Sequence, residues 1–302
     1  MLNPIADFKG KPFADTAIFM SGTGVLAEKL LTDYQRDLER EGDACPFRIR
    51  AVVTDAPETS RARELAARFN LPCVECDINA FYRANGEERN TIRTERGRRI
   101  RDMWTDELRR RLKEYDLDFA IFAGFVTLCN IAEDFPCLNV HPGDLTYLKD
   151  GERYLVGLHA IPVERAILEG LDYLRSSMIV ATPVSSDKDI DAGILLGISG
   201  ELKLDVSEER LAAFRAMAAA RPPVPRPAGW SDELRDFARE CQEKMKLACD
   251  YPVLYNTLRD FASGRFLYDA ESSQLYYRMG GGAPLPVRVM EYSEAGREII
   301  FR

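Results

Sequence analysis

The stretch Ile18-Phe-Met-Ser-Gly-Thr-Gly-Val-Leu-Ala-Glu-Lys-Leu30 runs from an apolar segment through a glycine-rich turn into an amphipathic helix. Such a turn can bind phosphate, because free backbone N–H groups and the helix dipole both point at the anion. A strand, a tight turn and a helix in this order also typically begin an open α/β sheet. The stretch therefore predicts a Rossmann-like fold, while its shape alone does not specify the ligand.

The chain from Thr16 to Val140 alternates short apolar runs with amphipathic stretches, which predicts a mostly parallel sheet with flanking helices. We expect strands at Thr16–Met20, Arg48–Thr54, Pro72–Glu75, Phe119–Ala123 and Cys137–Val140. We expect helices at Val25–Arg40, Ser60–Phe69 and about Thr91–Tyr115, with Ser60 as an N-cap.

The second half of the chain is less regular. A helix at about Pro162–Glu169 and strands at Ser177–Thr182 and Ile194–Leu202 continue the pattern. Helical runs at Glu208–Ala220 and Asp232–Cys249 flank a proline-rich stretch at 221–229, which we interpret as an inserted excursion. A C-terminal helix comes next, and a hairpin within Arg265–Met279 ends the predicted fold. We expect residues 1–302 to form a single domain.

Composition excludes several classes of protein. The 302 residues carry a net charge of −8, which argues against general nucleic-acid binding. No run approaches the roughly 18 apolar residues of a membrane span, and the N-terminus lacks a signal pattern. The seven cysteines suit reduced, packed thiols, and we interpret Cys73 and Cys76 as core residues. We therefore expect a cytoplasmic protein with no membrane contact.

One segment departs from the acidic balance of the chain. Arginines are dense from Arg93 to Arg111, with no acid between Glu95 and Asp102. The segment can face a phosphate or carboxylate ligand, or it can be a solvated helix face that pairs with neighbouring acids. Both interpretations stay open.

The two histidines are the residues best suited to proton chemistry near neutral pH. His141 lies at the carboxyl end of an apolar strand, and Asn139, two residues earlier, projects from the same face. An amide beside an imidazole can stabilise a developing oxyanion. Asp191, or next Asp189, lies in a loop between strands and can orient the imidazole as the third group of a catalytic set.

Four stretches in order resemble the folate-dependent formyltransferases, and most closely the glycinamide ribonucleotide formyltransferase branch. They are Met20-Ser-Gly-Thr-Gly24, Asp118-Phe-Ala-Ile-Phe-Ala-Gly-Phe-Val126, Leu138-Asn-Val-His-Pro142 with Gly157-Leu-His159, and Asp191-Ala-Gly193. The resemblance covers nearly the full chain, with insertions at about 83–105, 146–155 and 206–245. It implies the formyltransferase fold.

The resemblance implies formyl transfer from 10-formyltetrahydrofolate to a small amine, without a metal, and a place in purine biosynthesis. Asn139 would bond the formyl oxygen, His141 would be the charged or proton-handling partner, and Asp191 would organise His141. Folate would contact Phe125, Val126, Thr127, Leu128 and Asp189. The acceptor would contact Ser21, Gly22, Thr23, Gly24 and His159. A homodimer is compatible with this interpretation.

Three departures concern the acceptor. Val25 and Leu26 follow Gly24 where the family has hydrogen-bonding residues, Thr127 replaces a family arginine, and Leu247 replaces an acid, with Asp250 nearby but out of register. The acceptor is therefore open between a glycinamide ribonucleotide-like amine and another small amine.

Other functions also stay open. A 10-formyltetrahydrofolate hydrolase would use a similar residue set, and a noncatalytic folate or nucleotide sensor is a further alternative. A nicotinamide-dependent oxidoreductase would require an acid about 20 residues beyond the glycines, whereas Asp55 follows Gly24 by about thirty.

Overall fold

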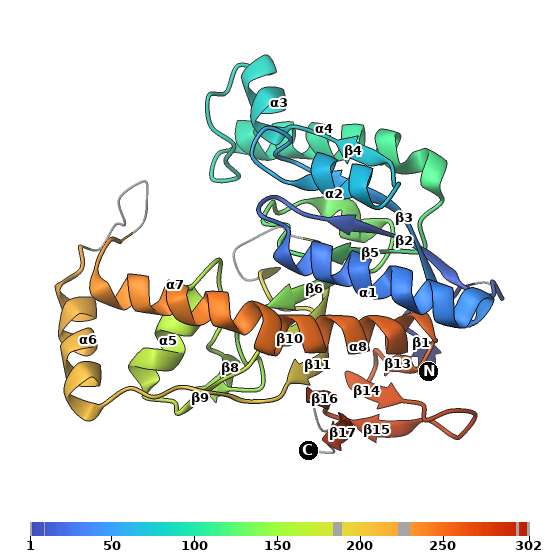
Figure 1. Cartoon of the computed structure of the whole chain (residues 1–302). Helices are drawn as coiled ribbons and strands as arrows, with labels where there is room; N and C mark the ends of the chain where they lie inside the picture. The colour runs from blue at the N-terminus through green and yellow to red at the C-terminus, as the bar shows by residue number, and fades with distance from the viewer. Residues whose placement is uncertain (1, 9, 184–188, 223–229, 294–295, 301–302) are drawn as a thin grey trace.

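The first expected strand lies inside a large mixed sheet. The computed structural model describes residues 2–8, 10–183, 189–222, 230–293 and 296–300. Within these ranges the main sheet contains β2 (Ala14–Phe19), β3 (Phe47–Thr54), β4 (Cys73–Glu75), β5 (Phe119–Phe122), β6 (Cys137–His141), β10 (Ser177–Ala181), β11 (Ile194–Ser199), β16 (Val289–Ser293) and β17 (Gly296–Ile300). Their spatial order is β17-β16-β11-β10-β6-β5-β2-β3-β4 (Figure 1).

The order of the strands creates a crevice. From β2 the chain builds outward through β3 and β4 and then returns to the other side of β2 with β5 and β6, all five strands being parallel. Open α/β sheets bind ligands where the strand order reverses, at the carboxyl ends of the strands. This point lies between β2 and β5. The strand β10 then runs antiparallel to both β6 and β11.

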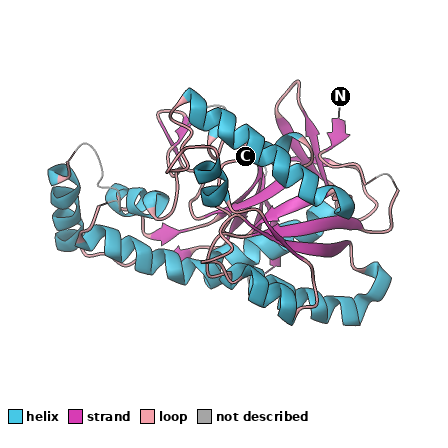
Figure 2. Ribbon diagram, turned by 90° about the horizontal axis from the view of Figure 1, so that it is seen from above, coloured by secondary structure: helices cyan, strands magenta, loops and turns pink. Residues whose placement is uncertain are grey.

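Helices cover both faces of the sheet (Figures 1 and 2). One buried cluster joins strand residues such as Ile18 to α1 (Val25–Glu41), α2 (Ala62–Arg68) and α8 (Tyr251–Ala262). The alternate strand residues, such as Phe19, pack against α3 (Ile78–Ala84) and α4 (Glu95–Leu112) on the other face. A third cluster, beside the sheet, joins α5 (Ile161–Glu169), α6 (Glu208–Ala220) and α7 (Glu233–Met245).

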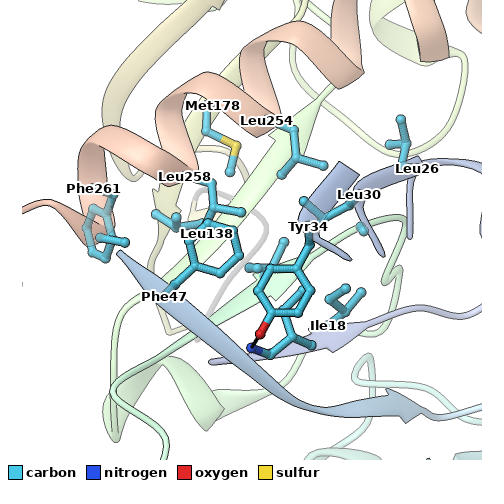
Figure 3. Close-up of a cluster of buried hydrophobic side chains, with 14 of the residues drawn as sticks. Ile18, Leu26, Leu30, Tyr34, Phe47, Leu138, Met178, Leu254, Leu258 and Phe261 are labelled. Atoms are coloured by element: carbon cyan, nitrogen blue, oxygen red, sulfur yellow. Dashed lines mark hydrogen bonds between the residues drawn. The ribbon is translucent and has the colours of Figure 1, made fainter. Parts of the chain in front are cut away.

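Figure 3 shows the first cluster at the junction of α1, α8 and the sheet. Leu254 and Leu258 of α8 are fully buried and belong to one cluster with Leu138 and Met178 of adjacent strands. The Tyr34 hydroxyl of α1 accepts a hydrogen bond from the backbone N–H of Ile49, 3.4 Å away. The α8 helix is therefore tied into the main core by its apolar face.

Smaller elements complete the described chain. A second, antiparallel sheet contains β1 (Leu2–Pro4), β13 (Phe266–Asp269), β14 (Gln274–Tyr277) and β15 (Leu285–Val287). Short strands pair as β7 (Leu148–Lys149) with β8 (Glu152–Arg153), and as β9 (Tyr173–Leu174) with β12 (Leu202–Lys203). Short 3-10 turns are η1 (Gly42–Ala44), η2 (Lys113–Tyr115) and η3 (Asn130–Glu133).

The mostly parallel α/β fold with flanking helices and a closing helix and hairpin is confirmed. Two helix starts differ from expectation. Arg61, not Ser60, is the N-cap of α2, although the Ser60 hydroxyl still accepts a hydrogen bond from the Ala62 N–H at 3.2 Å. The α4 helix begins only at Glu95, because the Thr94 hydroxyl caps it through the Gly97 N–H at 3.0 Å.

Other parts of the chain were not predicted or lie outside the structure. The sequence analysis did not predict α3, nor the strands β15, β16 and β17. Of the proline-rich stretch, residues 223–229 lie outside the described residues. Among the helices that the structure describes, none is long and apolar enough to cross a membrane.

The burial of α8 yields a stability prediction. We expect Leu258→Ala to lower the free energy of unfolding by about 3 kcal/mol, since it leaves a cavity at a fully buried site. Leu247→Ala, at a side chain that is 56% exposed, should change it by less than about 0.5 kcal/mol. Urea denaturation measures both. Equal effects of the two substitutions would contradict this packing.

Candidate active site

A cavity of about 210 Å³ lies at the carboxyl ends of β5 and β6. The segments that line it come from the loop after β5, from the end of β6, from the loops around 157–159 and 189–191, and from the helix before α8. Of the residues expected in a site, it brings together Phe125, Val126, Thr127, Leu128, Asn139, His141, His159, Asp189 and Asp191. Segments far apart in sequence thus meet at the crevice that the strand order predicts.

Asn139 and His141 lie on the same side of β6, as the alternation of an extended strand requires. The Asn139 side chain makes no hydrogen bond to another residue within the described ranges. Its amide can therefore donate to a ligand in the cavity. His141 is 3% exposed, so its ring faces protein groups almost entirely.

Both ring nitrogens of His141 face hydrogen-bond acceptors. The Nδ1 atom lies 3.2 Å from Oδ1 of Asp191, and the Nε2 atom lies 2.7 Å from the backbone carbonyl oxygen of Leu155. A ring satisfies two acceptors only when both nitrogens carry a proton. This arrangement therefore suits an imidazolium, with its positive charge, at the wall of the cavity.

A glycine after the His-Pro pair makes room for this contact. A Cβ atom at Gly143 would lie 2.7 Å from Nε2 of His141 and 2.5 Å from the Leu155 carbonyl oxygen. Both distances are shorter than a carbon atom tolerates, so any larger residue must displace the ring or the carbonyl group.

Asp191 is held from several sides. Its Oδ2 accepts a hydrogen bond from the Gly157 N–H at 2.9 Å, and its backbone carbonyl accepts one from Arg153 at 2.6 Å. Its φ of 57° is in the left-handed region, a conformation that needs support from its surroundings. Burial raises the pKa of Asp191, but the hydrogen bond and charge of His141 outweigh it and hold the pKa below its ordinary value.

Arg153 was not found by sequence reasoning. It comes from β8, inside one of the expected insertions, and also donates to the Gly193 carbonyl oxygen at 2.9 Å. The guanidinium therefore fixes the backbone of the turn that carries Asp191. No motif in the sequence marks it, because the contact depends on how the β7–β8 hairpin folds over the turn.

Three groups outside the cavity fix the loop after β5. The Ser21 hydroxyl accepts a hydrogen bond from the Val126 N–H at 3.2 Å, and the Thr127 hydroxyl donates to Asp55. Arg101 donates to the Leu128 carbonyl oxygen. Asp55, whose place the sequence analysis compared with the ribose-binding acid of oxidoreductases, is 3% exposed and supports the loop instead.

Other arginines of the basic segment pair on the surface. Arg109 lies 2.8 Å from Asp106, and Arg110 lies 2.8 Å from Glu107. This pairing favours the interpretation of α4 as a solvated helix face, with Arg101 as the exception that turns inward.

The first strand-to-helix turn is not part of the cavity wall. Among the described residues that line the cavity, none is Ser21, Gly22, Thr23 or Gly24, whereas Leu26 is. Glu28, in the first turn of α1, pairs with Arg61 at 2.9 Å and also with Arg68. A carboxylate thus already uses the positive end of this helix. His159 does line the cavity, with an exposed side chain.

The segments α7, η5 (Lys246–Asp250) and α8 follow one another without a break and form one long helix, the closing helix. It contributes three cavity residues that the sequence did not predict. They are Gln242, Lys246 and Asp250, each four residues from the next. In an α-helix, an advance of four residues rotates the side chain by about 40° more than one full turn, so residues at this spacing gradually leave a common face. The π-helical turn η5 is wider, turns less per residue and offsets this rotation.

Asp250 is the most buried of these three residues, at 6% exposed. The Ser176 hydroxyl donates to its Oδ1 at 2.5 Å. Burial raises the pKa of Asp250 to about 6, and the hydrogen bond from Ser176 limits the rise. From the sequence, Leu247 and not Asp250 aligns with the acid of the family, because a π-helical turn has no reliable sequence signal. In the structure Asp250 lines the cavity, and the Leu247 side chain is exposed.

Comparisons with known proteins agree on the fold. No protein-family model and no curated protein sequence matches the chain. Phosphoribosylglycinamide formyltransferase from Coxiella burnetii is 18% identical, with a TM-score of 0.56 over 93% of this chain and 99% of that one. The enzyme of the same name from Anaplasma phagocytophilum is 13% identical, with the same TM-score and coverage.

A formyltetrahydrofolate deformylase from Pseudomonas syringae pv. tomato is 14% identical, with a TM-score of 0.53 over 85% of this chain and 64% of that one. At these identities the likeness establishes the fold that the chain shares with these enzymes. The expected formyltransferase fold is therefore confirmed.

The buried carboxyl group of Asp250 predicts a pH-dependent stability. Its pKa rises from 3.8 to about 6 on folding, so the folded protein binds this proton more tightly than the unfolded chain does. The stabilisation is complete below about pH 4 and is lost as the pH rises through about 6. Asn is neutral throughout, so we expect Asp250→Asn to be up to about 3 kcal/mol more stable than the wild type at pH 8.

Urea denaturation at several pH values measures this difference, with Glu240→Gln as the control at an exposed acid of α7. The advantage of Asp250→Asn should disappear near pH 4. A difference between Asp250→Asn and the wild type that stays constant across this pH range would contradict the burial of an ionisable group.

Proposed function

We propose that the protein is an enzyme that transfers the formyl group of 10-formyltetrahydrofolate to an amine. The observation that carries the proposal is the convergence of the Asn139 amide and the clamped His141 ring on one cavity, with Asp191 behind the ring. The shared fold is a second support. In this proposal residues 1–302 act as one catalytic domain in the cytoplasm.

The chemistry requires charge stabilisation at the formyl oxygen. When an amine attacks the formyl carbon, negative charge develops on that oxygen as the carbon becomes tetrahedral. The Asn139 side chain, which has no protein partner in the described chain, donates to it. The imidazolium of His141 supplies positive charge from a buried position, where electrostatic stabilisation is stronger than in water.

The folate has a suitable wall to bind. Phe125, Val126 and Leu128 provide apolar surface, and Val126 is 44% exposed for contact with a flat ring. The backbone of this segment is fixed from behind through Ser21, Thr127 and Arg101, which leaves a preorganised edge for hydrogen bonds to a pterin. Asp189 also lines this cavity.

The acceptor side differs from that expected for a ribonucleotide. Leu26 occupies cavity wall beside the first turn, and an apolar side chain offers no hydrogen bond to a phosphate. The acceptor is therefore a glycinamide ribonucleotide-like amine or a smaller one. The same apolar wall favours hydrolysis to formate as the second candidate, since water needs no phosphate contact.

A direct assay tests the proposal. Purified protein is incubated with 10-formyltetrahydrofolate, and tetrahydrofolate is measured with and without glycinamide ribonucleotide. Turnover that requires the amine supports transfer, and turnover in water alone supports the hydrolase. Absence of folate binding would contradict both.

Substitution of Asn139 tests the role of its amide. We expect Asn139→Ala to lower kcat by about 10² to 10³, because one donor to the oxyanion is lost. Asn79→Ala, at an exposed position on α3, is the matched control and should keep the wild-type rate. Both variants should unfold at the same urea concentration as the wild type. An Asn139→Ala enzyme with a normal rate would remove this residue from the mechanism.

A further inference from the structure

We propose that Asp250 is the base of this reaction, which takes the proton from the attacking nitrogen and returns it to N10 of the folate. The inference rests on the proposed function and adds a residue outside the Asn139, His141 and Asp191 set. It is argued from the hydrogen bonds of the cavity.

Both ring nitrogens of His141 are held by acceptors of the protein. A base must offer a lone pair, but the ring directs Nδ1 at a carboxylate and Nε2 at the Leu155 carbonyl, at 3.2 and 2.7 Å. With both nitrogens protonated, the ring has no lone pair in its plane. His141 can therefore stabilise the oxyanion by its charge, and the proton of the attacking amine must go elsewhere.

Both carboxylate oxygens of Asp191 already have partners in the protein. One of its oxygens pairs with His141 and the other accepts the Gly157 N–H at 2.9 Å. Protonation of this carboxyl group would weaken both contacts and uncover the charge of the ring. Its place in the structure suits a fixed counter-charge.

Asp250 has the geometry of a base. It lines the same cavity as His141, together with Gln242 and Lys246, and the charges of Asp250 and His141 interact across it. Its Oδ1 accepts the Ser176 hydroxyl, while its Oδ2 makes no hydrogen bond to another residue in the described ranges. This second oxygen has a lone pair for a proton.

Among the residues that the structure describes, no cationic side chain pairs directly with the Asp250 carboxylate. His141 on β6 and Lys246 on the helix favour its ionised form, and Glu243 opposes it. Lys246 itself pairs with Glu243 at 2.6 Å. The neighbouring thiol of Cys249 is buried, and burial raises its pKa to about 11, so it stays neutral. A pKa of about 6 lets Asp250 be ionised at neutral pH and still accept a proton readily.

A single carboxylate accounts for the proton that moves during formyl transfer. The amine nitrogen forms a bond to the formyl carbon, and one N–H proton moves to Asp250. As the bond between the formyl carbon and N10 breaks, the carboxylic acid gives this proton to N10. Both nitrogens are attached to the same tetrahedral carbon, so one side chain reaches each in turn. With water as the nucleophile, the same transfers release formate.

The experiment measures turnover of 10-formyl-5,8-dideazafolate, a donor without N5 that does not cyclise in acid, between about pH 5 and pH 8. The nucleophile is glycinamide ribonucleotide or water, whichever the wild type uses. Folate affinity is measured separately by titration calorimetry. Asp250→Asn is compared with Glu240→Gln, a matched change at an exposed carboxylate of α7.

For the wild type and Glu240→Gln, we expect kcat to rise with pH and level off above about 6. Asp250→Asn should lower kcat about 10² to 10⁴-fold and abolish this rise, with folate affinity changed less than about threefold. Ser176→Ala should move the rise to higher pH, because the lost hydrogen bond favoured the carboxylate.

Two results would overturn the inference. If Asp250→Asn turns over within about threefold of the wild type and keeps the pH rise, the base lies elsewhere and the proposed function still stands. If the wild type neither binds nor turns over the donor, the proposed function fails, and the role of Asp250 fails with it.

Discussion

The two contacts of the buried His141 ring are the interactions on which the rest of the site depends. A polar ring that is 3% exposed needs a partner at each nitrogen, and the chain supplies these partners from two separate segments, at Asp191 and at the Leu155 carbonyl. Each of these has its own support. Arg153 holds the turn that carries Asp191, and Gly143 leaves the space through which the Leu155 carbonyl reaches the ring.

The fold supplies the place for this charge. The parallel strands β5 and β6 end side by side next to the reversal of the strand order between β2 and β5, and their last residues line a crevice to which Leu26 of α1 and the closing helix also contribute. The loop after β5 is fixed by groups beneath it, with Ser21 on the Val126 N–H and Asp55 on the Thr127 hydroxyl. The cavity therefore combines a loop held by hydrogen bonds with side chains from the closing helix.

Much of this could be predicted from the sequence, and particular residues show why. Asn139 and His141 are on one strand, and alternation places them on one side; Asp191 precedes a glycine in a loop between strands, and it meets the ring. These relations depend on local periodicity. The parallel core of the sheet follows from the same kind of pattern.

The residues that sequence reasoning missed depend on longer-range geometry. Arg153 contacts the Asp191 turn only because a hairpin folds over it, and Asp250 reaches the cavity only because one helical turn widens. Ser21, which the sequence predicts as an acceptor contact, also accepts a hydrogen bond from the Val126 N–H, and this contact has no local signal because the two residues are far apart in the chain. The strands β16 and β17 extend the sheet beyond the expected hairpin, and pairing partners so far apart carry no local signal.

The widened turn also joins two bodies of the molecule. Cys249, just before Asp250, packs with the outlying helices α5, α6 and α7, whereas Tyr251, just after it, packs with the main core. Asp250 thus lies at a boundary between two buried clusters, and its side chain lines the cavity there. The packing of the outlying helices therefore bears on where this carboxyl group lies, because its immediate neighbour in sequence is buried among them.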